Sequence, residues 1–406
     1  MTSTTLTTGK QEILPPPTER YTVLGWIRKN LFGSWFDGIL TIVGLAFIIY
    51  AGVGSLRWAF TSARWSVITD NFALFMKGQY PLEQVWRLWV GLYLLAFVVG
   101  LLWGVFVRQR SFTAWVLLGA PVLFALIVLI IGGSGGWLSL LLVDVLAVAG
   151  WALARWQPQR TRRAAITLLI LYFPLLILII RGFGAEGFLS LVPTNLWGGL
   201  LLSLLIAVVG IVFSFPFGVL LALGRQSQLR AVKTLCVIYI EFIRGVPLIT
   251  LLFMGQVMLP FFLPSNVVID RVIRAMVAVI LFAAAYLAEN VRGGLQAIPK
   301  GQYEAADAIG LNGFQKMTYI ILPQALRAVI PVLVGQFIGL FKDTSLVALV
   351  GLLDLLGIAR GVLANPNYIG RQIEVYVFVA LVYWVFSYSM SYGSRRLEVA
   401  LGVGER

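Results

Sequence analysis

Long runs of apolar residues dominate this chain, and short polar stretches separate them. An apolar run of about 17 to 25 residues is long enough for an α-helix to cross a lipid bilayer. Such runs predict ten transmembrane helices, near residues 36–56, 88–107, 112–132, 137–153, 164–180, 197–223, 235–262, 273–291, 326–341 and 373–393. The predicted fold class is therefore an all-α polytopic membrane protein.

The apolar run at 235–262 contains Gly245 and Pro247. Proline cannot donate a backbone hydrogen bond inside a helix, so we expect the helix to kink or break there. Glu241 and Arg244 come just before the break, three residues apart and therefore on one helical face. Two interpretations are open. The pair lines a translocation path at a broken helix, or the two side chains satisfy each other near the membrane face.

The composition limits the kinds of catalysis and metal binding that this chain can support. Of the 406 residues, 60% are hydrophobic and 12% are charged, there is no histidine, and Cys236 is the single cysteine. Histidine-based catalysis, His or Cys metal sites and an internal disulfide are therefore excluded or nearly so. The sequence also lacks the Gly-x4-Gly-Lys-Ser/Thr motif of a P-loop, so the chain should not hydrolyse ATP on such a loop.

Basic residues indicate the orientation, because lysine and arginine accumulate in cytoplasmic loops. With the N-terminus inside, twenty of the 31 basic residues fall on the cytoplasmic side and nine on the opposite side. We therefore expect both termini and the polar stretch 296–325 to face the cytoplasm. The net charge of +14 then reflects this bias and anionic lipid headgroups, and it requires no nucleic-acid partner.

The polar stretch 296–325 predicts two short helices joined by a sharp bend. Pro299 suits the start of the first helix, and Gly310 can adopt the left-handed conformation that ends it. Asn312 can cap the second helix, with Gln315 three residues later as its reciprocal partner, and Pro323 is expected near the end of that helix. We expect the two helices to form an exposed knob between membrane spans.

The same stretch carries a recognisable motif. Glu304, Ala305 and Ala306 are followed by Gly310 four residues after the second alanine, and by Ile321-Leu322-Pro323 further on. This pattern resembles the EAA loop by which the membrane subunits of bacterial ABC importers insert into a groove of their ATPase subunits.

Three other segments look like signatures of the polar amino-acid uptake branch of these importers, and they occur in that family's order. They are Glu241–Leu248, Tyr286–Gly294 and Lys342–Leu346. The resemblance covers about half of the chain. The additional N-terminal spans, and a tryptophan-containing loop near 57–87, resemble the longer of the two permease subunits of general L-amino-acid importers. Val246 and Asn290 depart from the pattern, where threonine and an aliphatic residue would be expected.

This resemblance implies a domain organisation. It comprises a cytoplasmic tail at 1–35, an extension of about five helices at 36–193, a type I ABC permease core at 194–394, and a cytoplasmic tail at 395–406. The loop near 57–87 would be periplasmic, and the core would carry the coupling helices near 296–325.

The resemblance also implies a function. The chain would be a permease subunit in the bacterial inner membrane, coupling ATP hydrolysis on a separate subunit to import of polar or charged L-amino acids. It would not be an enzyme and would bind no cofactor, because ATP and Mg would sit on the ATPase. The implied partners are a second homologous permease, two ATP-binding subunits, a periplasmic substrate-binding protein, the amino acid and membrane lipid.

Two groups of site residues follow from the matched motifs. The residues expected to couple the chain to the ATPase are Tyr303, Glu304, Ala305, Ala306, Asp307, Gly310 and Leu311. The residues expected along the substrate pathway are Glu241, Arg244, Glu289, Lys342, Asp343, Thr344 and Ser345. Alternatives are open for the second group, since Glu289 can form an interfacial pair with Arg292, and a polar elbow such as 342–345 can simply cap helices.

A different class of transporter also fits the span count. An ion-coupled secondary amino-acid transporter with a five-plus-five inverted repeat would have two halves of five spans with opposite starting sides. Against it, the first half has no counterpart of the break at Gly245–Pro247, and that fold gives no reason for a knob at Glu304.

Overall fold

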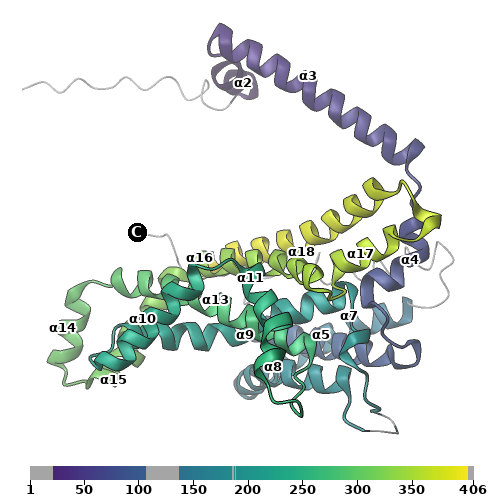
Figure 1. Cartoon of the computed structure of the whole chain (residues 1–406). Coiled ribbons are helices and arrows are strands. Elements are labelled where there is room, and N and C mark those ends of the chain that lie inside the picture. Colours follow the sequence, from purple (N-terminus) through teal and green to yellow (C-terminus); the bar gives the residue numbers. More distant parts are fainter. Residues whose placement is uncertain (1–21, 107–136, 185–186, 188, 401–406) are drawn as a thin grey trace, which may run out of the picture. The chain divides into compact units, whose positions relative to one another are not determined.

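The computed structural model describes residues 22–106, 137–184, 187 and 189–400, and this part of the chain folds into helices joined by short connections (Figure 1). The α-helices are α2 (Val23–Leu31), α3 (Trp35–Arg57), α4 (Ser66–Lys77), α5 (Trp86–Phe106), α7 (Trp137–Trp156), α8 (Pro158–Arg181), α9 (Gly199–Arg225), α10 (Arg230–Arg244), α11 (Leu248–Phe253), α12 (Leu259–Phe262), α13 (Arg271–Gln296), α14 (Lys300–Ala308), α15 (Gly313–Gln315), α16 (Leu322–Asp343), α17 (Leu355–Leu363) and α18 (Gln372–Ala400). Short 3-10 and π-helical segments are η1 (Trp58–Ser62), η2 (Leu82–Gln84), η3 (Thr194–Leu196), η4 (Met254–Met258), η5 (Lys316–Ile321), η6 (Thr344–Val350) and η7 (Pro366–Tyr368).

The chain divides into two compact units, Met1–Trp65 and Ser66–Arg406. In the first unit, α3 is a 23-residue apolar helix with no buried residue. A helix that is apolar on all sides is suited to lipid or to another membrane helix, and not to water. The second unit contains the remaining helices and the sites described below.

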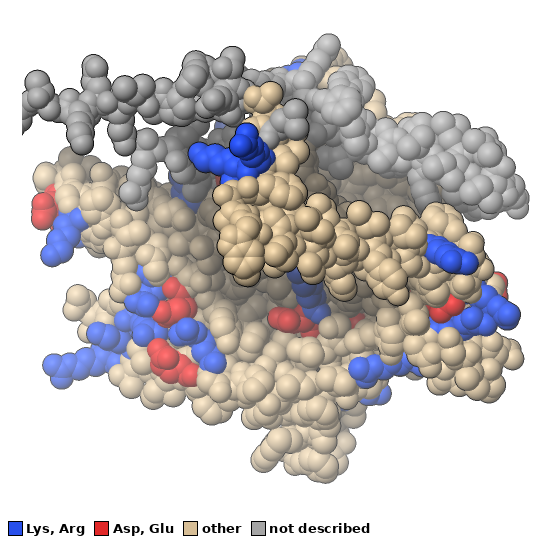
Figure 2. All heavy atoms as spheres, turned by 90° about the horizontal axis from the view of Figure 1, so that it is seen from above, with Lys and Arg blue, Asp and Glu red and all other residues tan. Residues whose placement is uncertain are grey.

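In the described residues, eight helices are long and apolar enough to cross a membrane, or nine if α10 and the α11–α12 segment count as one bent span. These correspond to nine of the ten apolar runs in the sequence. The remaining run, 112–132, lies outside the described residues. Most of the surface shown in Figure 2 is uncharged, and its basic and acidic side chains occur in groups.

The predicted break at 235–262 is present. Helix α10 ends at Arg244, α11 begins after Pro247, and the two segments are bent by 103°. The run is therefore not one straight spanning helix. Pro247 has the fixed backbone angle that starts a helix, so the sequence that ends α10 also begins α11.

The second helix of the polar stretch 296–325 is not the expected short helix but the start of a long helical run. α15, η5, α16 and η6 follow one another without a gap, so a single helical run extends over 313–350. Pro323 lies in the first turn of α16, where the missing backbone N–H is tolerated. It follows the π-helical segment η5 and does not end the helix.

Helices α5 and α7 pack unusually closely because of their glycines. A Cβ atom on Gly150 would lie 2.3 Å from the carbonyl oxygen of Phe97, and one on Gly100 would lie 2.1 Å from that of Ala147. Membrane helices without an aqueous driving force between them gain association energy from such close backbone contact. The extension therefore has its own small-residue interface.

Replacing Gly150 by alanine is expected to separate α5 from α7 and to lower the free energy of unfolding by about 1–3 kcal/mol, the usual cost of overpacking. Thermal unfolding of the purified chain in detergent measures this. Gly44→Ala in α3 is the matched control, because a Cβ there would meet nothing within 4 Å. Equal melting temperatures for the two variants would contradict the close packing.

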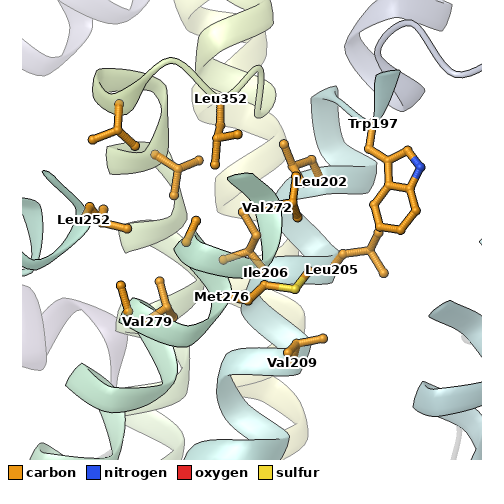
Figure 3. Close-up of a cluster of buried hydrophobic side chains, with 14 of the residues drawn as sticks. Trp197, Leu202, Leu205, Ile206, Val209, Leu252, Val272, Met276, Val279 and Leu352 are labelled. Carbon is orange, nitrogen blue, oxygen red and sulfur yellow. The ribbon is translucent and has the colours of Figure 1, made fainter. Parts of the chain in front are cut away.

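Helices α9 and α13 form the centre of the second unit. Their apolar faces meet in a cluster that includes Leu202, Ile206, Val272, Met276 and Val279, drawn in Figure 3. Figure 1 shows α14 and α15 at one end of the long helices and α4 and α17 at the other. The loop that connects α13 to α15 and the segment around Gly351 thus lie at opposite ends of the same bundle.

Candidate functional site

Helix α14, the turn after it and α15 form the exposed knob, residues 300–315. Backbone geometry fixes the C-terminal end of α14. Gly310 has φ +77°, its N–H donates to the carbonyl of Asp307, and the N–H of Leu311 donates to the carbonyl of Ala306. This pair of bonds is the Schellman arrangement, which requires a left-handed residue after the helix. The predicted role of Gly310 as the residue that ends the helix is confirmed.

The turn after α14 is held by side chains as well. Asn312 and Gln315 form the predicted capping box, in which each side chain bonds the other residue's backbone N–H at 2.9 and 3.1 Å. Lys316 Nζ lies 2.6 Å from Asp307 Oδ1 and so ties α14 to η5. These contacts fix the turn after α14 and join α14 directly to the helical run that follows it.

The residues of the EAA motif divide between core and surface. Ala306 is buried, and Tyr303 packs against the cluster that contains Leu295, Ile321 and Ala325. The other expected coupling residues, Glu304, Ala305, Asp307 and Gly310, are exposed, while Leu311 is half-buried.

Two large apolar side chains that the sequence reading did not single out are exposed on the same knob. Ile309 is 71% exposed and Phe314 is 76% exposed. Their position directly beside the glycine turn was the signal available in the sequence. Exposed apolar side chains on a polar loop are typical of a surface that another protein covers.

Five charged residues from three helices form a second feature, which we call the charge cluster: Arg225, Glu241, Arg244, Glu289 and Arg292. Glu289 is its centre. Its carboxylate lies 3.3 Å from Arg225 and 3.8 Å from Arg244, and it accepts hydrogen bonds from Arg292. Because these partners come from α9, α10 and α13, one carboxylate links three helices.

Glu241 is the second acid of the charge cluster. It lies 2.9 Å from Arg225 and 4.0 Å from Arg244. Glu241 and Arg244 thus meet each other, as the second interpretation expects, and both also meet residues far away in the sequence. The sequence did not identify Arg225 as a site residue, because a single basic residue at the end of a span has no distinctive pattern.

Asn290, which departs from the family's sequence pattern, has a polar partner in Gln336. Its side-chain nitrogen donates to Gln336 Oε1 at 2.7 Å, and Gln336 Nε2 donates to the carbonyl of Ala283 at 2.9 Å. A polar bridge therefore joins α13 to α16 one residue beyond Glu289. Sequence reasoning did not identify Gln336, because a single glutamine in an apolar run carries no distinctive pattern.

The segment 342–345 and the charge cluster lie at different positions along the length of the helix bundle. Leu340 belongs to the apolar cluster around Val272 and Met276, whereas Leu287, two residues before Glu289, belongs to the other cluster, around Ile321. Thr344 is buried and its hydroxyl donates to the carbonyl of Phe341 at 2.7 Å. Among the described residues, no ion pair joins Lys342 or Asp343 to the charge cluster.

Comparison with known proteins gives a consistent result. Residues 214–401 match the family model described as binding-protein-dependent transport system inner membrane component. The chain is 41% identical over 397 residues to the inner membrane amino-acid ABC transporter permease protein YhdY of Escherichia coli strain K12, with 93% of each chain covered. It is 39% identical over 431 aligned positions to the glutamate/glutamine/aspartate/asparagine transport system permease protein BztC of Rhodobacter capsulatus, with 95% of each chain covered.

A shorter relative matches only part of the chain. The probable glutamine ABC transporter permease protein GlnP of Bacillus subtilis is 36% identical over 207 residues. Those residues are 50% of the present chain and 92% of the relative. Nearly the whole of a short permease therefore corresponds to half of this one.

Proposed function

Because this chain belongs to the family of inner-membrane permease components of binding-protein-dependent amino-acid ABC transporters, we propose that the knob and the charge cluster are its coupling site and part of its substrate path. The chain is a multi-pass inner-membrane protein, the permease subunit of an amino-acid importer. It is not an enzyme, since ATP hydrolysis in this family takes place on separate subunits. The relatives favour this function over an ion-coupled carrier with an inverted repeat.

The knob is the surface that meets the ATPase. The observation that carries this proposal is an exposed loop with fixed ends, on which two apolar side chains, Ile309 and Phe314, are exposed together with Glu304 and Ala305. A groove on the partner would cover the apolar pair, and the fixed ends of the knob would transmit the movement. Tyr303 and Ala306 would hold the knob to the membrane core instead of contacting the partner.

The charge cluster forms part of the substrate path at the end of the bundle that carries the knob. Its five residues comprise three arginines and two glutamates, so one positive charge remains in excess. An amino acid brings a carboxylate for an arginine and an ammonium for a glutamate. Passage of the substrate would break the ion pair between Glu289 of α13 and Arg225 of α9, and the pair would form again afterwards. Lys342, Asp343, Thr344 and Ser345 would act at a different stage, because they lie at another level.

The substrates we propose are polar or charged L-amino acids. The printed name of the Rhodobacter capsulatus relative gives glutamate, glutamine, aspartate and asparagine, and the excess positive charge of the cluster is compatible with that set. The partners comprise an ATPase and a substrate-binding protein. We further propose two ATPase subunits, which hold ATP and Mg, and a second, homologous permease. The knob and both termini would face the cytoplasm.

A pull-down from gently solubilised native membranes, followed by mass spectrometry, tests this function. We expect a P-loop ATPase and a second permease to co-purify with the chain. A chain that purifies alone, yet transports amino acids in proteoliposomes under an ion gradient, would overturn the proposal in favour of the secondary carrier.

A further inference from the structure

A cavity of about 420 Å³ lies at the end of the bundle opposite the knob. Four segments line it: the end of α8, the stretch 191–197, the start of α13, and the stretch 351–353. It is therefore separate from the charge cluster, because α9 and α13 each extend about 40 Å between the two ends at 1.5 Å per residue. A volume of this size is within the range of small-molecule sites.

The charged lining of the cavity consists of Arg181, Asp270 and Arg271. Arg271 Nη2 donates to the carbonyl oxygens of Val350 and Gly351, each at 3.2 Å, so its guanidinium is held in place. Arg181 is exposed, and its side chain makes no hydrogen bond or ion pair with the described residues. Two guanidinium groups beside one carboxylate leave the cavity with an excess positive charge.

The carboxylate of Asp270 has a fixed position. It caps α13 by accepting hydrogen bonds from the N–H groups of Val272 and Ile273, and it also accepts one from the Thr194 hydroxyl. These donors hold the carboxylate in place. The cavity thus presents Asp270 and Arg271 at the start of α13, and Arg181 at the end of α8.

Trp197 provides an independent sign of a missing ligand. It lines the cavity and is only 3% exposed, and its indole nitrogen is buried without a hydrogen-bond partner among the described residues. A buried donor without an acceptor is unfavourable, so an acceptor carried by a ligand would relieve it.

We infer that this cavity is an entry site for a free acidic amino acid, an inference that rests on the proposed function. Two guanidinium groups and one carboxylate match, in number and sign, the two carboxylates and one ammonium of such a molecule. The indole N–H supplies a further donor to a carboxylate oxygen. Apolar side chains such as Leu191, Val272 and Leu352 would contact its short carbon chain. The site would be occupied before the substrate reaches the charge cluster.

The test uses the complete complex in nanodiscs without its binding protein, with radiolabelled L-glutamate as the probe and L-lysine as the comparison ligand. Arg181→Gln removes one cation that makes no contact needed for folding. We expect it to weaken glutamate binding about tenfold, the loss of one charge-assisted hydrogen bond. Trp197→Phe removes the indole N–H while keeping an aromatic ring, and a weaker loss is expected. Arg163→Gln, an exposed arginine at the other end of α8, is the control and should bind as the unmodified complex does.

Each outcome decides the inference. Unchanged glutamate binding in both Arg181→Gln and Trp197→Phe would overturn it, and so would equal affinity for lysine and glutamate. If Arg181→Gln weakened only the docking of the binding protein, the cavity would accept that partner's acidic side chain, and the entry site would be wrong. ATP-driven uptake by the unmodified complex is measured in parallel, with the binding protein added back. Absence of all amino-acid uptake would contradict the proposed function itself, whereas uptake with unaltered binding in the variants would contradict only the entry site.

Discussion

Gly310→Val is expected to reduce ATP-driven amino-acid uptake more than tenfold while the chain still inserts and assembles. Gly310 has φ +77°, and a β-branched residue there is strained by about 1–2 kcal/mol. The strain is relieved by unwinding the end of α14, which breaks the bonds from Gly310 and Leu311 to Asp307 and Ala306. The knob then deforms when the ATPase pushes on it, and the movement of the ATPase no longer reaches the membrane helices. Uptake by proteoliposomes containing the whole complex measures the effect.

The control for this variant lies at the start of α14, the helix that Gly310 ends. A Cβ on Gly301 would meet nothing within 4 Å, and Gly301 has no positive φ, so Gly301→Val should retain most of the uptake. Co-purification of the ATPase with both variants shows that assembly is intact. Normal uptake by Gly310→Val would refute the role of a rigid knob in coupling.

Glu289→Gln is expected to disable transport and to lower the free energy of unfolding of the complex. The substitution removes the carboxylate shared by Arg225, Arg244 and Arg292, and these three cations then repel one another. The side chains are 21–32% exposed, so solvent screens part of the interaction, and a loss of about 1–3 kcal/mol is appropriate. Uptake rate and thermal unfolding of the purified complex are the two measurements.

Glu241→Gln provides the comparison. Its side chain is 54% exposed, and it contacts two arginines where Glu289 contacts three. We expect a smaller change in both measurements. Equal effects of the two substitutions would mean that Glu289 is not the centre of the cluster, and unchanged uptake in Glu289→Gln would remove the charge cluster from the substrate path.

Local features of the knob and the helix break could be predicted from the sequence because their causes lie within a few residues. The partners of Gly310, Asn312 and Pro247 are three to five positions away, and backbone geometry allows few alternatives there. The spans could be predicted for the same reason, since each needs only one apolar run.

Features that join distant segments could not be predicted in the same way. Arg225 meets Glu289, 64 positions later, and nothing in the sequence around Arg225 specifies that contact. The cavity is built from four separate segments, and its key donor, the Trp197 indole, reads in sequence only as an interfacial aromatic residue. Pro323 was expected near a helix end, but a proline in a first turn and one near a helix end look alike in sequence until the neighbouring turns are known.

The uninterrupted helical run 313–350 has a mechanical consequence. It begins in the knob, three residues after Gly310, and ends at Gly351, a second left-handed glycine, which lines the cavity at the far end. At 1.5 Å per residue such a rod is roughly 57 Å long, so a tilt of about 5° at one end displaces the other by about 5 Å. A left-handed glycine lies beside each end of this helical run, and under the proposed function a movement at the knob would reach the cavity at the far end through one continuous helix instead of a relay of side chains.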